Sequence, residues 1–383
     1  MRIVQICPFF TPHVGGVESH VGIVATELSR RGHQVTVLTS RHERYLPVKE
    51  RDPRGFDIVR TPSLGTLFAT PITLSVGKTL RDLDADLFHL HYPPPVTSYF
   101  AARMLRHRDT PTCLTYHCDL DLKGPAGRLV AGLYQKLFLP LTLDVPDSII
   151  VHTIGYGKTS RFLRDLPLVI IPSLVDTTRF HPGEDDTELR KKLGAEGKRI
   201  LLFVGRLVPH KGVDDLIRAL PLLPEDVLLV IVGDGPDLET LQDFAGNRGV
   251  QQRVRFVGAV SAEDLPRYYA TATLFVFPSQ NRLEGFGLAP LEALASGKPV
   301  VVADMPGVRE VVVEGEDGLL AQPLLPENLA EKCIALLNDP SRMELMGRMA
   351  RENALKKYSI SVVVDRLEKL YLELISGSHA SAA

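Results

Sequence analysis

The sequence predicts an α/β fold built from two parallel-sheet domains. Short apolar, β-branched segments alternate with longer helix-like stretches, and this alternation is typical of parallel strands covered by helices. The alternation starts again in the second half of the chain. The 383 residues also exceed the roughly 250–300 residues beyond which a single core usually gives way to two. We therefore expect one sheet in each half.

The expected strands are short and evenly spread. The first sheet should use residues 3–7, 34–39, 57–60, 86–91, 112–116, 148–152 and 168–171. The second sheet should use residues 199–204, 227–232, 254–257, 274–277, 299–303 and 318–321. A polar, turn-rich stretch after Pro182 predicts a linker near residues 176–182, so the expected domains are 1–177 and 178–360. Apolar residues at helical spacing predict a final helix at about 361–377.

Composition and cysteine usage favour a cytoplasmic protein. Hydrophobic residues make up 44% and charged residues 23% of the chain, which is an ordinary globular composition. The first apolar segment is too short for a signal peptide, and no stretch reaches the ~20 apolar residues of a membrane-spanning helix. The four cysteines form neither a CxxC pair nor a zinc-ligand spacing with histidine.

The two halves differ in charge, although the net charge is only −2. Residues 1–180 hold 21 basic and 16 acidic side chains, whereas residues 181–383 hold 23 basic and 30 acidic ones. Nine of the twelve histidines also lie in the first half. This half is therefore expected to meet an anionic partner, with a chance imbalance as the alternative.

A glycine pair follows the first expected strand, within residues 8–18. Gly15 and Gly16 would let backbone amides approach a ligand at the start of a helix expected from about Ser19, where partial positive charge favours phosphate. A plain turn is the alternative. Because no GxGxxG pattern occurs here, a nicotinamide dinucleotide is disfavoured.

A basic loop follows the first expected strand of the second half. It contains Gly205, Arg206 and Lys211. Arg206 presents a planar fork of donors and Lys211 a point charge, a combination that suits a diphosphate. A solvated loop is the alternative, disfavoured by the position of these residues after a core strand.

The strongest pattern spans residues 278–297. Pro290 suits the first turn of a helix and Gly297 its end, so backbone amides near residues 286–288 should point out of the helix start and form an anion site. Glu284 and Glu292 would repel an anion there unless they accept hydrogen bonds from neutral hydroxyls. A glycosylated nucleotide supplies such hydroxyls. The alternative is that both glutamates are ordinary acids favoured by the helix dipole.

Taken in order, these patterns resemble the family-four retaining glycosyltransferases of the GT-B fold. The resemblance rests on the glycine pair, on Gly-Arg with a downstream Lys-Gly, and on two glutamates that flank Gly-Phe-Gly-Leu. It extends to residues 28–38, 256–258 and 297–301, and so covers nearly the whole chain. It implies two Rossmann-like parallel-sheet domains facing across a cleft, with the final helix returning to the first domain.

The resemblance implies a role for each residue of the two patterns in the second half. Glu292 would accept hydrogen bonds from ribose hydroxyls and Glu284 from a sugar hydroxyl. Arg206 and Lys211 would hold the diphosphate. The backbone amides that would contribute to the same anion site are those of Phe286, Gly287 and Leu288.

Three further residues receive roles by resemblance alone. Gly16 would lie near phosphate, Val260 near the base, and His117 near the donor sugar. For His117, a histidine of the core is the alternative, because other histidines also end expected strands. These are His89, His91 and His152.

The implied enzyme is a retaining hexosyltransferase. It would move a hexose-type sugar from a nucleotide diphosphate sugar, such as a UDP- or GDP-sugar, to an acceptor hydroxyl. No separate cofactor and no metal are expected, because Arg206 and Lys211 stand where other transferases use a metal. The acidic triplet at residues 84–86 is not taken as a metal motif, since it begins a strand rather than ending one.

The acceptor is indicated only by an apolar stripe within residues 125–139. Such a stripe, flanked by cations, is typical of a helix at a membrane surface, although core packing is its commoner cause. The stripe consists of Leu129, Val130, Leu133 and Leu137, beside Arg128 and Lys136. With the positive balance of this half, it favours a lipid-linked or glycan acceptor at the inner face of the membrane. An anionic membrane surface is then a candidate partner, and nucleic acid is not.

Two other classes of protein stay open. A dinucleotide-dependent oxidoreductase would need the glycine fingerprint that is missing after the first strand. A non-catalytic nucleotide-binding module would keep the phosphate-binding residues but would not need both glutamates.

Overall fold

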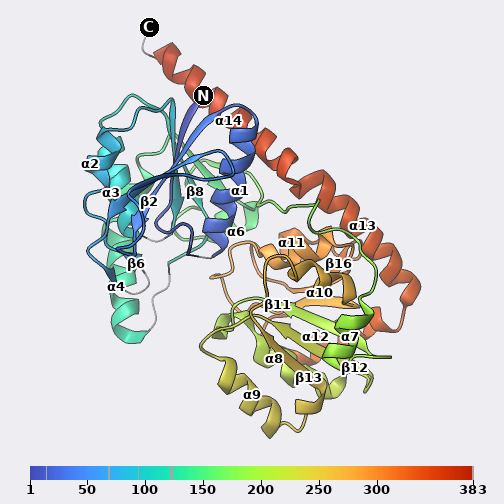
Figure 1. Cartoon of the computed structure of the whole chain (residues 1–383). Coiled ribbons are helices and arrows are strands. Elements are labelled where there is room, and N and C mark those ends of the chain that lie inside the picture. The colour runs from blue at the N-terminus through green and yellow to red at the C-terminus, as the bar shows by residue number, and fades with distance from the viewer. Residues whose placement is uncertain (14, 68–69, 94, 121–123, 382–383) are drawn as a thin grey trace. The chain divides into compact units, whose positions relative to one another are not determined.

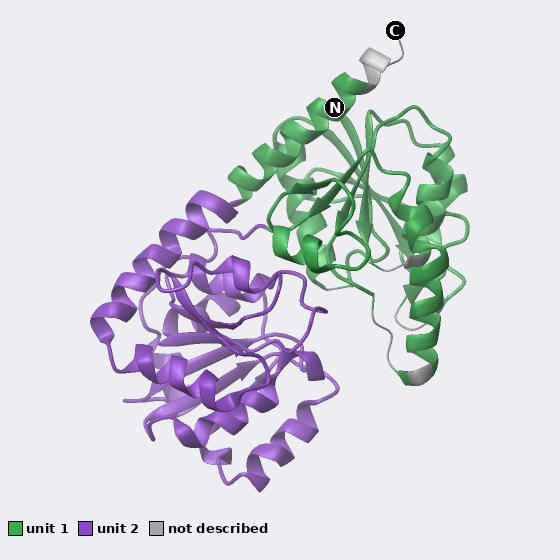
Figure 2. Ribbon diagram, turned by 180° about the vertical axis from the view of Figure 1, so that it is seen from behind, with its two compact units in different colours: residues 1–173, 360–383 green, residues 174–359 purple. Residues whose placement is uncertain are grey.

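The computed structural model describes the whole chain except residues 14, 68–69, 94, 121–123 and 382–383. The chain forms two units, coloured separately in Figure 2. Unit 1 comprises Met1–Ser173 with Ile360–Ala383, and unit 2 comprises Leu174–Ser359. Each unit has its own mainly parallel sheet and its own hydrophobic core, which confirms the predicted α/β class with one sheet in each half.

The main sheet of unit 1 has the strand order β10-β9-β8-β7-β1-β2-β4-β3. Its parallel strands are β1 (Arg2–Ile6), β2 (Gln34–Arg41), β4 (Asp57–Pro62), β7 (Leu87–Tyr92), β8 (Thr112–Tyr116), β9 (Ser148–Val151) and β10 (Leu168–Ile170). All seven were expected from the sequence. The antiparallel edge strand β3 (Lys49–Arg51) and the small hairpin of β5 (Thr66–Leu67) and β6 (Thr70–Pro71) were not, because their short segments carry no apolar run.

The helices of unit 1 include one that comes from the far end of the sequence. They are α1 (Gly16–Arg30), α2 (Val76–Arg81), α3 (Pro95–Leu105), α4 (Gly124–Leu137), α5 (Leu139–Leu143), α6 (Ile154–Thr159) and α14 (Ile360–Ser381). Helix α14 runs beside α1 (Figure 1). Arg31, just after α1, binds Asp365 at 2.6 Å and Glu368 at 2.8 Å. Helix α1 begins three residues earlier than the sequence indicated.

The sheet of unit 2 is entirely parallel, in the order β13-β12-β11-β14-β15-β16. Its strands are β11 (Arg199–Val204), β12 (Val227–Val232), β13 (Val254–Gly258), β14 (Leu274–Phe277), β15 (Val300–Ala303) and β16 (Gly318–Ala321). All six follow the expected segments. Their side chains are buried almost throughout, because helices cover a parallel sheet on both faces.

Short connections join these strands to the helices of unit 2. The α-helices are α7 (Thr187–Leu193), α8 (Val213–Ala219), α9 (Leu238–Asn247), α10 (Leu265–Thr271), α11 (Leu288–Ala295), α12 (Pro326–Leu337) and α13 (Pro340–Tyr358). Single 3₁₀ turns are η1 (Pro209–Lys211), η2 (Leu220–Leu222), η3 (Gln251–Arg253) and η4 (Arg309–Val311).

The strand order of unit 2 reverses between β11 and β14, which are neighbours in the sheet. Strands β12 and β13 extend the sheet to one side, whereas β15 and β16 extend it to the other. Ligands of open α/β sheets bind at the carboxyl ends of the strands where the order reverses. The loops that leave β11 and β14 carry the basic pattern and the glutamate pattern found in the sequence.

Candidate functional site

The loops after β11 and β14 lie against each other at the carboxyl edge of the unit 2 sheet. The amide of Gln280 donates to the carbonyl of His210 at 2.8 Å. Gly212 has φ +70°, and a Cβ atom there would lie 2.1 Å from the carbonyl oxygen of Pro278. Only glycine allows this approach of two backbones. The fold therefore brings together two patterns that lie about seventy residues apart in the sequence.

The two loops are joined by an ion pair between Lys211 and Glu284. The side chains are only 15% and 12% exposed, so both charges are largely removed from water. Lys211 Nζ also lies 4.8 Å from the centre of the Phe277 ring, in a cation–π contact. Of the residues predicted from the sequence, these two meet directly.

Arg206 belongs to the same loop as Lys211 but is exposed. Its guanidinium forms no hydrogen bond or ion pair within the described part of the chain. Gly205, just before it, is the first residue after β11. It lies against the loop after β12, because a Cβ atom on Gly233 would lie 1.9 Å from the Gly205 carbonyl oxygen. Three loops thus approach each other at one edge of the sheet, with Arg206 pointing to solvent.

Helix α11 begins beside this pair, four residues after Glu284. Gly287 precedes the helix with φ +92°, a conformation that favours glycine, and Leu288 is the first helical residue. Phe286 is buried and packs edge-on against Tyr358, with ring centres 6.0 Å apart, so it contributes backbone rather than side chain to any ligand. The first-turn amides of a helix lack intrahelical acceptors, although Pro290 has no amide hydrogen to offer.

Glu292 lies one turn into α11 and is partly buried. The Tyr269 hydroxyl lies 2.7 Å from its Oε2 and 3.2 Å from the carbonyl oxygen of Ala289. One hydroxyl proton cannot serve both acceptors at full strength. If Glu292 is protonated it donates to the Tyr269 oxygen, and the tyrosine proton is then free for Ala289.

Burial raises the pKa of Glu292 to about 7, against the opposing effects of the Tyr269 hydroxyl and of Arg179. With a pKa of about 7, this carboxyl is only partly ionised at neutral pH. A ligand that donates hydroxyl hydrogens to Glu292 would favour the ionised form instead. Tyr269 was not singled out in the sequence, since the contact spans 23 residues and no local pattern marks it.

Val260 lies in the connection between β13 and α10, where it packs on the edge of the unit 2 core. It therefore follows the strand next to β12, at the same edge of the sheet as the loops already described. No side-chain contact joins Val260 to Lys211, Glu284 or Glu292 within the described residues.

In unit 1, Gly15 and Gly16 lie at the start of α1, as the sequence predicted; Val14 is outside the described residues. The helix start is covered by the carboxyl group of Glu18. A Cβ atom on Gly15 would lie 2.4 Å from Glu18 Oε2, and Glu18 Oε1 lies 3.1 Å from His13 Nδ1. Burial raises the pKa of Glu18. A phosphate at this helix start would have to displace that carboxyl.

His117 follows β8 and belongs to a cluster of five histidines in unit 1. Its Nε2 lies 3.0 Å from His91 Nδ1, and its Nδ1 lies 3.0 Å from His152 Nε2. The other members are His20 and His89. His89 and His91 are fully buried, whereas His117 is partly exposed. Burial lowers the pKa of His117 well below its ordinary value.

Two observations bear on the acidic triplet at residues 84–86 and on metal binding. Asp84 and Asp86 form ion pairs with Arg2, at the end of the sheet opposite its carboxyl edge. Among the described residues, no group of three or more histidine, cysteine, aspartate or glutamate side chains is arranged to hold a metal ion.

The apolar stripe of α4 is exposed rather than packed in the core. Leu129 is 74% and Leu133 55% exposed, and the cations Arg128 and Lys136 are exposed beside them. Core packing is therefore the wrong explanation for this stripe. Its exposed side chains, continued into α5, are those of Leu129, Val130, Leu133, Leu137, Phe138 and Leu141. No helix in the described part of the chain is long and apolar enough to span a membrane.

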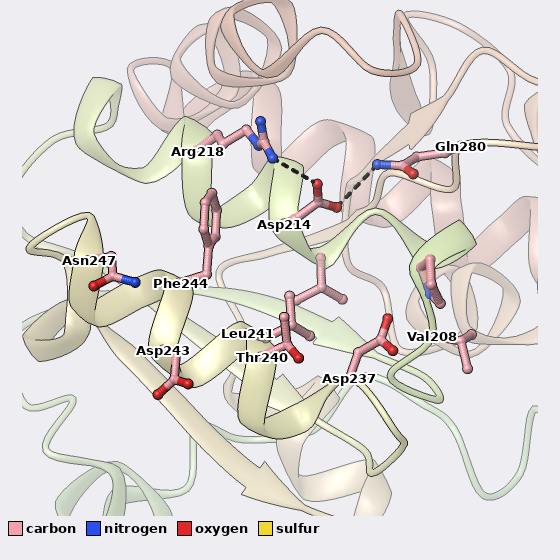
Figure 3. A pocket seen from close by; sticks show the side chains of 12 residues that line it. Val208, Asp214, Arg218, Asp237, Thr240, Leu241, Asp243, Phe244, Asn247 and Gln280 are labelled. Carbon is pink, nitrogen blue, oxygen red and sulfur yellow. Dashed lines mark hydrogen bonds and ion pairs between the residues drawn. The ribbon is translucent and has the colours of Figure 1, made fainter.

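A cavity of about 490 Å³ lies between α8 and α9 in unit 2 (Figure 3). Asp214 on its wall accepts hydrogen bonds from Gln280 at 3.1 Å and pairs with Arg218 at 3.3 Å. Its other lining residues are Val208, Pro209, Val213, Asp237, Thr240, Leu241, Asp243, Phe244 and Asn247. None of the predicted site residues lines this cavity, although it shares the loops after β11 and β14 with them.

Two family profiles match the chain. The family described as "Glycosyl transferases group 1" matches residues 185–353, and the one described as "Glycosyltransferase Family 4" matches residues 14–179.

Two bacterial relatives match over most of their length. The chain is 30% identical to a GDP-mannose-dependent alpha-(1-6)-phosphatidylinositol monomannoside mannosyltransferase of Mycolicibacterium smegmatis, covering 96% of both chains. It is 32% identical to a GDP-mannose-dependent alpha-mannosyltransferase of Corynebacterium glutamicum, covering 90% of this chain and 83% of the relative.

Solved structures share the fold at lower identity. Sucrose-phosphate synthase from Thermosynechococcus elongatus has a TM-score of 0.83 at 22% identity, covering 98% of this chain and 99% of that one. Anabaena HepE in complex with UDP and glucose has a TM-score of 0.78 at 20% identity, covering 97% and 100%. These likenesses show the GT-B fold that the sequence patterns implied.

The protonated state of Glu292 generates a stability prediction. Glu292 keeps its proton to about pH 7 in the folded chain but only to about pH 4.5 when unfolded, so the folded state loses stability as pH rises between these values. Glu292→Gln mimics the protonated acid. We expect it to match the wild type at pH 4.5 and to exceed its unfolding free energy by on the order of 2 kcal/mol at pH 8.5.

Denaturant unfolding at both pH values measures this difference. Glu239→Gln, at an exposed position on α9, is the matched control and should show the same small difference at both pH values. A Glu292→Gln effect that does not change with pH would contradict the raised pKa.

Proposed function

The chain belongs to the group 1 glycosyltransferases, and from this premise we propose that it transfers mannose from GDP-mannose to a hydroxyl of a lipid-linked or glycan acceptor. The transfer retains the anomeric configuration and needs no metal. The observation that carries this proposal is the ion pair of Lys211 and Glu284 beside the start of α11, with Glu292 one turn further on. Neither an oxidoreductase nor a simple nucleotide-binding module accounts for both glutamates at this position.

The choice of donor is supported by the relatives. The mannosyltransferases of M. smegmatis and C. glutamicum use GDP-mannose by name and match this chain nearly from end to end. The solved UDP complexes are of more distant proteins. We therefore favour GDP-mannose over a UDP-sugar.

The charges at the site suit a diphosphate leaving group. As the bond from the anomeric carbon to the phosphate oxygen breaks, negative charge grows on the diphosphate. Lys211, the exposed Arg206 and the first-turn amides of α11 supply positive charge and partial positive charge to meet it. This is the work that a metal ion performs in other transferases, which is the reason for proposing metal independence.

The two glutamates accept hydrogen bonds from hydroxyl groups on different parts of the donor. Glu284 pairs with Lys211, and when Lys211 turns toward the phosphate, a sugar hydroxyl takes its place as the donor to Glu284. Glu292, held by Tyr269, accepts from the ribose hydroxyls and must give up its proton to do so. Nucleotide binding near neutral pH is then coupled to proton release.

Retention is proposed to occur by attack from the face that the diphosphate leaves, with a phosphate oxygen taking the acceptor proton. Gly16 is assigned to the region of the phosphate, Val260 to that of the base and His117 to that of the sugar. In unit 1 this assignment requires Glu18 to move off the start of α1 when phosphate arrives.

The exposed stripe on α4 supports an acceptor at an anionic membrane surface. Its leucines follow one face at intervals of four residues, and Arg128 and Lys136 lie beside them. An amphipathic helix of this kind lies in the membrane interface, with cations at the level of anionic head groups. The enzyme is thereby proposed to act at the cytoplasmic face, on a lipid-linked acceptor within reach of unit 1.

The donor proposal is tested by incubating the purified chain with GDP-mannose, GDP-glucose, UDP-glucose and UDP-N-acetylglucosamine and measuring sugar release and transfer. We expect GDP-mannose to be used best, chelator to leave the rate nearly unchanged, and the product to keep the α configuration by NMR. Lys211→Ala should lower kcat/KM about 100-fold, the effect of losing one electrostatic contact of about 3 kcal/mol.

Lys332→Ala is the matched control, since Lys332 also pairs with a glutamate of unit 2, at 4.0 Å from Glu314, but lies outside the site. Its rate should equal that of the wild type. Wild-type turnover by Lys211→Ala, or a rate that chelator abolishes and manganese restores, would contradict the proposal.

Membrane binding is tested by sedimentation with vesicles that contain one third phosphatidylglycerol. The double variant Leu133→Asp/Leu137→Asp should bind at least tenfold more weakly, since burying one leucine side chain is worth about 1.5–3 kcal/mol. Leu345→Asp, on α13 and as exposed as Leu133, is the control and should bind like the wild type. Equal binding by both variants would rule out α4 as the contact surface.

A further inference from the structure

His117 is the middle member of a chain of hydrogen bonds through unit 1. At one end, His152 Nδ1 lies 3.1 Å from the carbonyl oxygen of Ile171. His152 Nε2 contacts His117 Nδ1, and His117 Nε2 contacts His91 Nδ1, each at 3.0 Å. At the other end, His91 Nε2 lies 2.6 Å from the amide oxygen Oε1 of Gln5 on β1.

The amide of Gln5 links this chain to the C-terminal helix. Its nitrogen Nε2 lies 3.2 Å from the hydroxyl of Tyr371 on α14. That hydroxyl lies 2.6 Å from His89 Nδ1, and His89 Nε2 lies 2.7 Å from Thr115 Oγ1. All of these groups except His117 are buried in the core of unit 1.

The number of available hydrogens limits how this chain of hydrogen bonds can be arranged. Four hydrogen bonds connect the Ile171 carbonyl to Gln5 through three imidazole rings, and each bond needs one hydrogen. Three neutral rings supply three hydrogens, and the carbonyl supplies none. The fourth hydrogen comes either from the NH2 group of Gln5 or from an additional proton that makes one ring cationic.

The surroundings decide between these two cases. Burial lowers the pKa of His152 to about 4 and that of His91 well below its ordinary value. Among the residues that the structure describes, the ionisable groups in ring or hydrogen-bond contact with this chain of hydrogen bonds are His20 of α1, His89 of β7 and Tyr371 of α14. Burial lowers the pKa of both these histidines and raises that of the tyrosine, so none supplies a compensating negative charge near neutral pH. A cationic ring is therefore unfavourable. The hydrogens then suffice only if the Gln5 amide is turned end for end, so that Nε2 rather than Oε1 faces His91 and Oε1 faces Tyr371.

We infer that Gln5 is a positioning residue for His117, because its amide, oriented by Tyr371, fixes which nitrogen of each histidine in the chain carries the hydrogen. With Gln5 donating, His91, His117 and His152 all hold their hydrogen on Nδ1. His117 then donates from Nδ1 to His152 and accepts at Nε2 from His91. The amide oxygen of Gln5 accepts from Tyr371, which accepts in turn from His89.

This arrangement defines what His117 offers to a ligand. Both ring nitrogens are already engaged within the protein, so the ring is fixed in orientation and neutral. It does not exchange protons with substrate at neutral pH, and it serves as a rigid wall beside the sugar. The role of this chain of hydrogen bonds in the reaction rests on the role proposed for His117. The predicted positions of the ring hydrogens do not rest on it.

The tautomers are measured directly by NMR of the full chain labelled with 15N in its histidine rings, where protonated and unprotonated nitrogens have well separated shifts. At pH 7.5 we expect His91, His117 and His152 to carry hydrogen on Nδ1 alone. Hydrogen on Nε2 of His117, or a doubly protonated ring in this trio, would overturn the inference. This measurement on the unsubstituted protein is independent of donor turnover, so its failure is distinguishable from failure of the proposed function.

Gln5→Glu tests the cause. A carboxylate at this position only accepts, so the chain must take up one proton, and we expect one doubly protonated ring at pH 7.5. Transfer should fall about tenfold, as when the outer partner of a functional histidine is lost, and the pH profile of kcat/KM should gain a new limb near neutral pH. Thr115→Val is the control, because it removes the partner of His89 and leaves the trio untouched. Unchanged tautomers in Gln5→Glu, or the same new pH limb in Thr115→Val, would overturn the inference.

Discussion

The ion pair between Lys211 and Glu284 is the interaction on which the site in unit 2 depends. It joins the loops after β11 and β14 where the strand order of the sheet reverses. Two charges so far removed from water are stable only as a pair, since loss of one partner leaves the other buried and uncompensated. In the proposed donor complex, the diphosphate would therefore compete with Glu284 for Lys211, and a sugar hydroxyl that donates to Glu284 would compensate the carboxylate for the weakened pair. Binding of both halves of the donor at once would then restore the balance of charge.

The same reasoning applies to the other acidic groups at the predicted site. Burial raises the pKa of Glu292 to about 7 despite the opposing effect of Arg179, and Glu18 covers the start of α1, where the backbone amides are partly positive. In each unit the carboxyl group is accounted for by its own surroundings: Glu292 by burial and the Tyr269 hydroxyl, and Glu18 by His13 and the start of α1.

Much of this could be predicted from the sequence, for physical reasons that differ between features. The strands of both sheets were evident because buried parallel strands require continuous apolar runs, such as Val227–Val232. The edge strand Lys49–Arg51 was not, since its polar residues pair only on one side. The exposure of the α4 stripe could not be decided, because a helix that faces the core and one that faces a membrane have the same apolar periodicity.

Contacts between distant segments could not be foreseen at all. Gln5 meets Tyr371 across 366 residues, and no local pattern in either segment indicates the partner. The motifs assigned Lys211 and Glu284 to the same donor site, but they did not indicate the ion pair between them. Nor did they indicate that the Tyr269 hydroxyl is shared between Glu292 and the Ala289 carbonyl. Sequence patterns located the groups that carry charge, and the three-dimensional structure revealed what holds each of them.

The central claim is that the two glutamates recognise hydroxyls on different parts of the donor. Isothermal titration calorimetry of GDP and GDP-mannose with the full chain tests it most directly. Glu292→Gln should weaken both ligands alike, by about tenfold, because an amide oxygen accepts less well than a carboxylate. Glu284→Gln should leave GDP affinity unchanged or tighter, because Lys211 loses its competing anion, and should weaken GDP-mannose alone. Equal losses for both ligands in both variants would contradict the account and leave the glutamates as ordinary acids of a helix start.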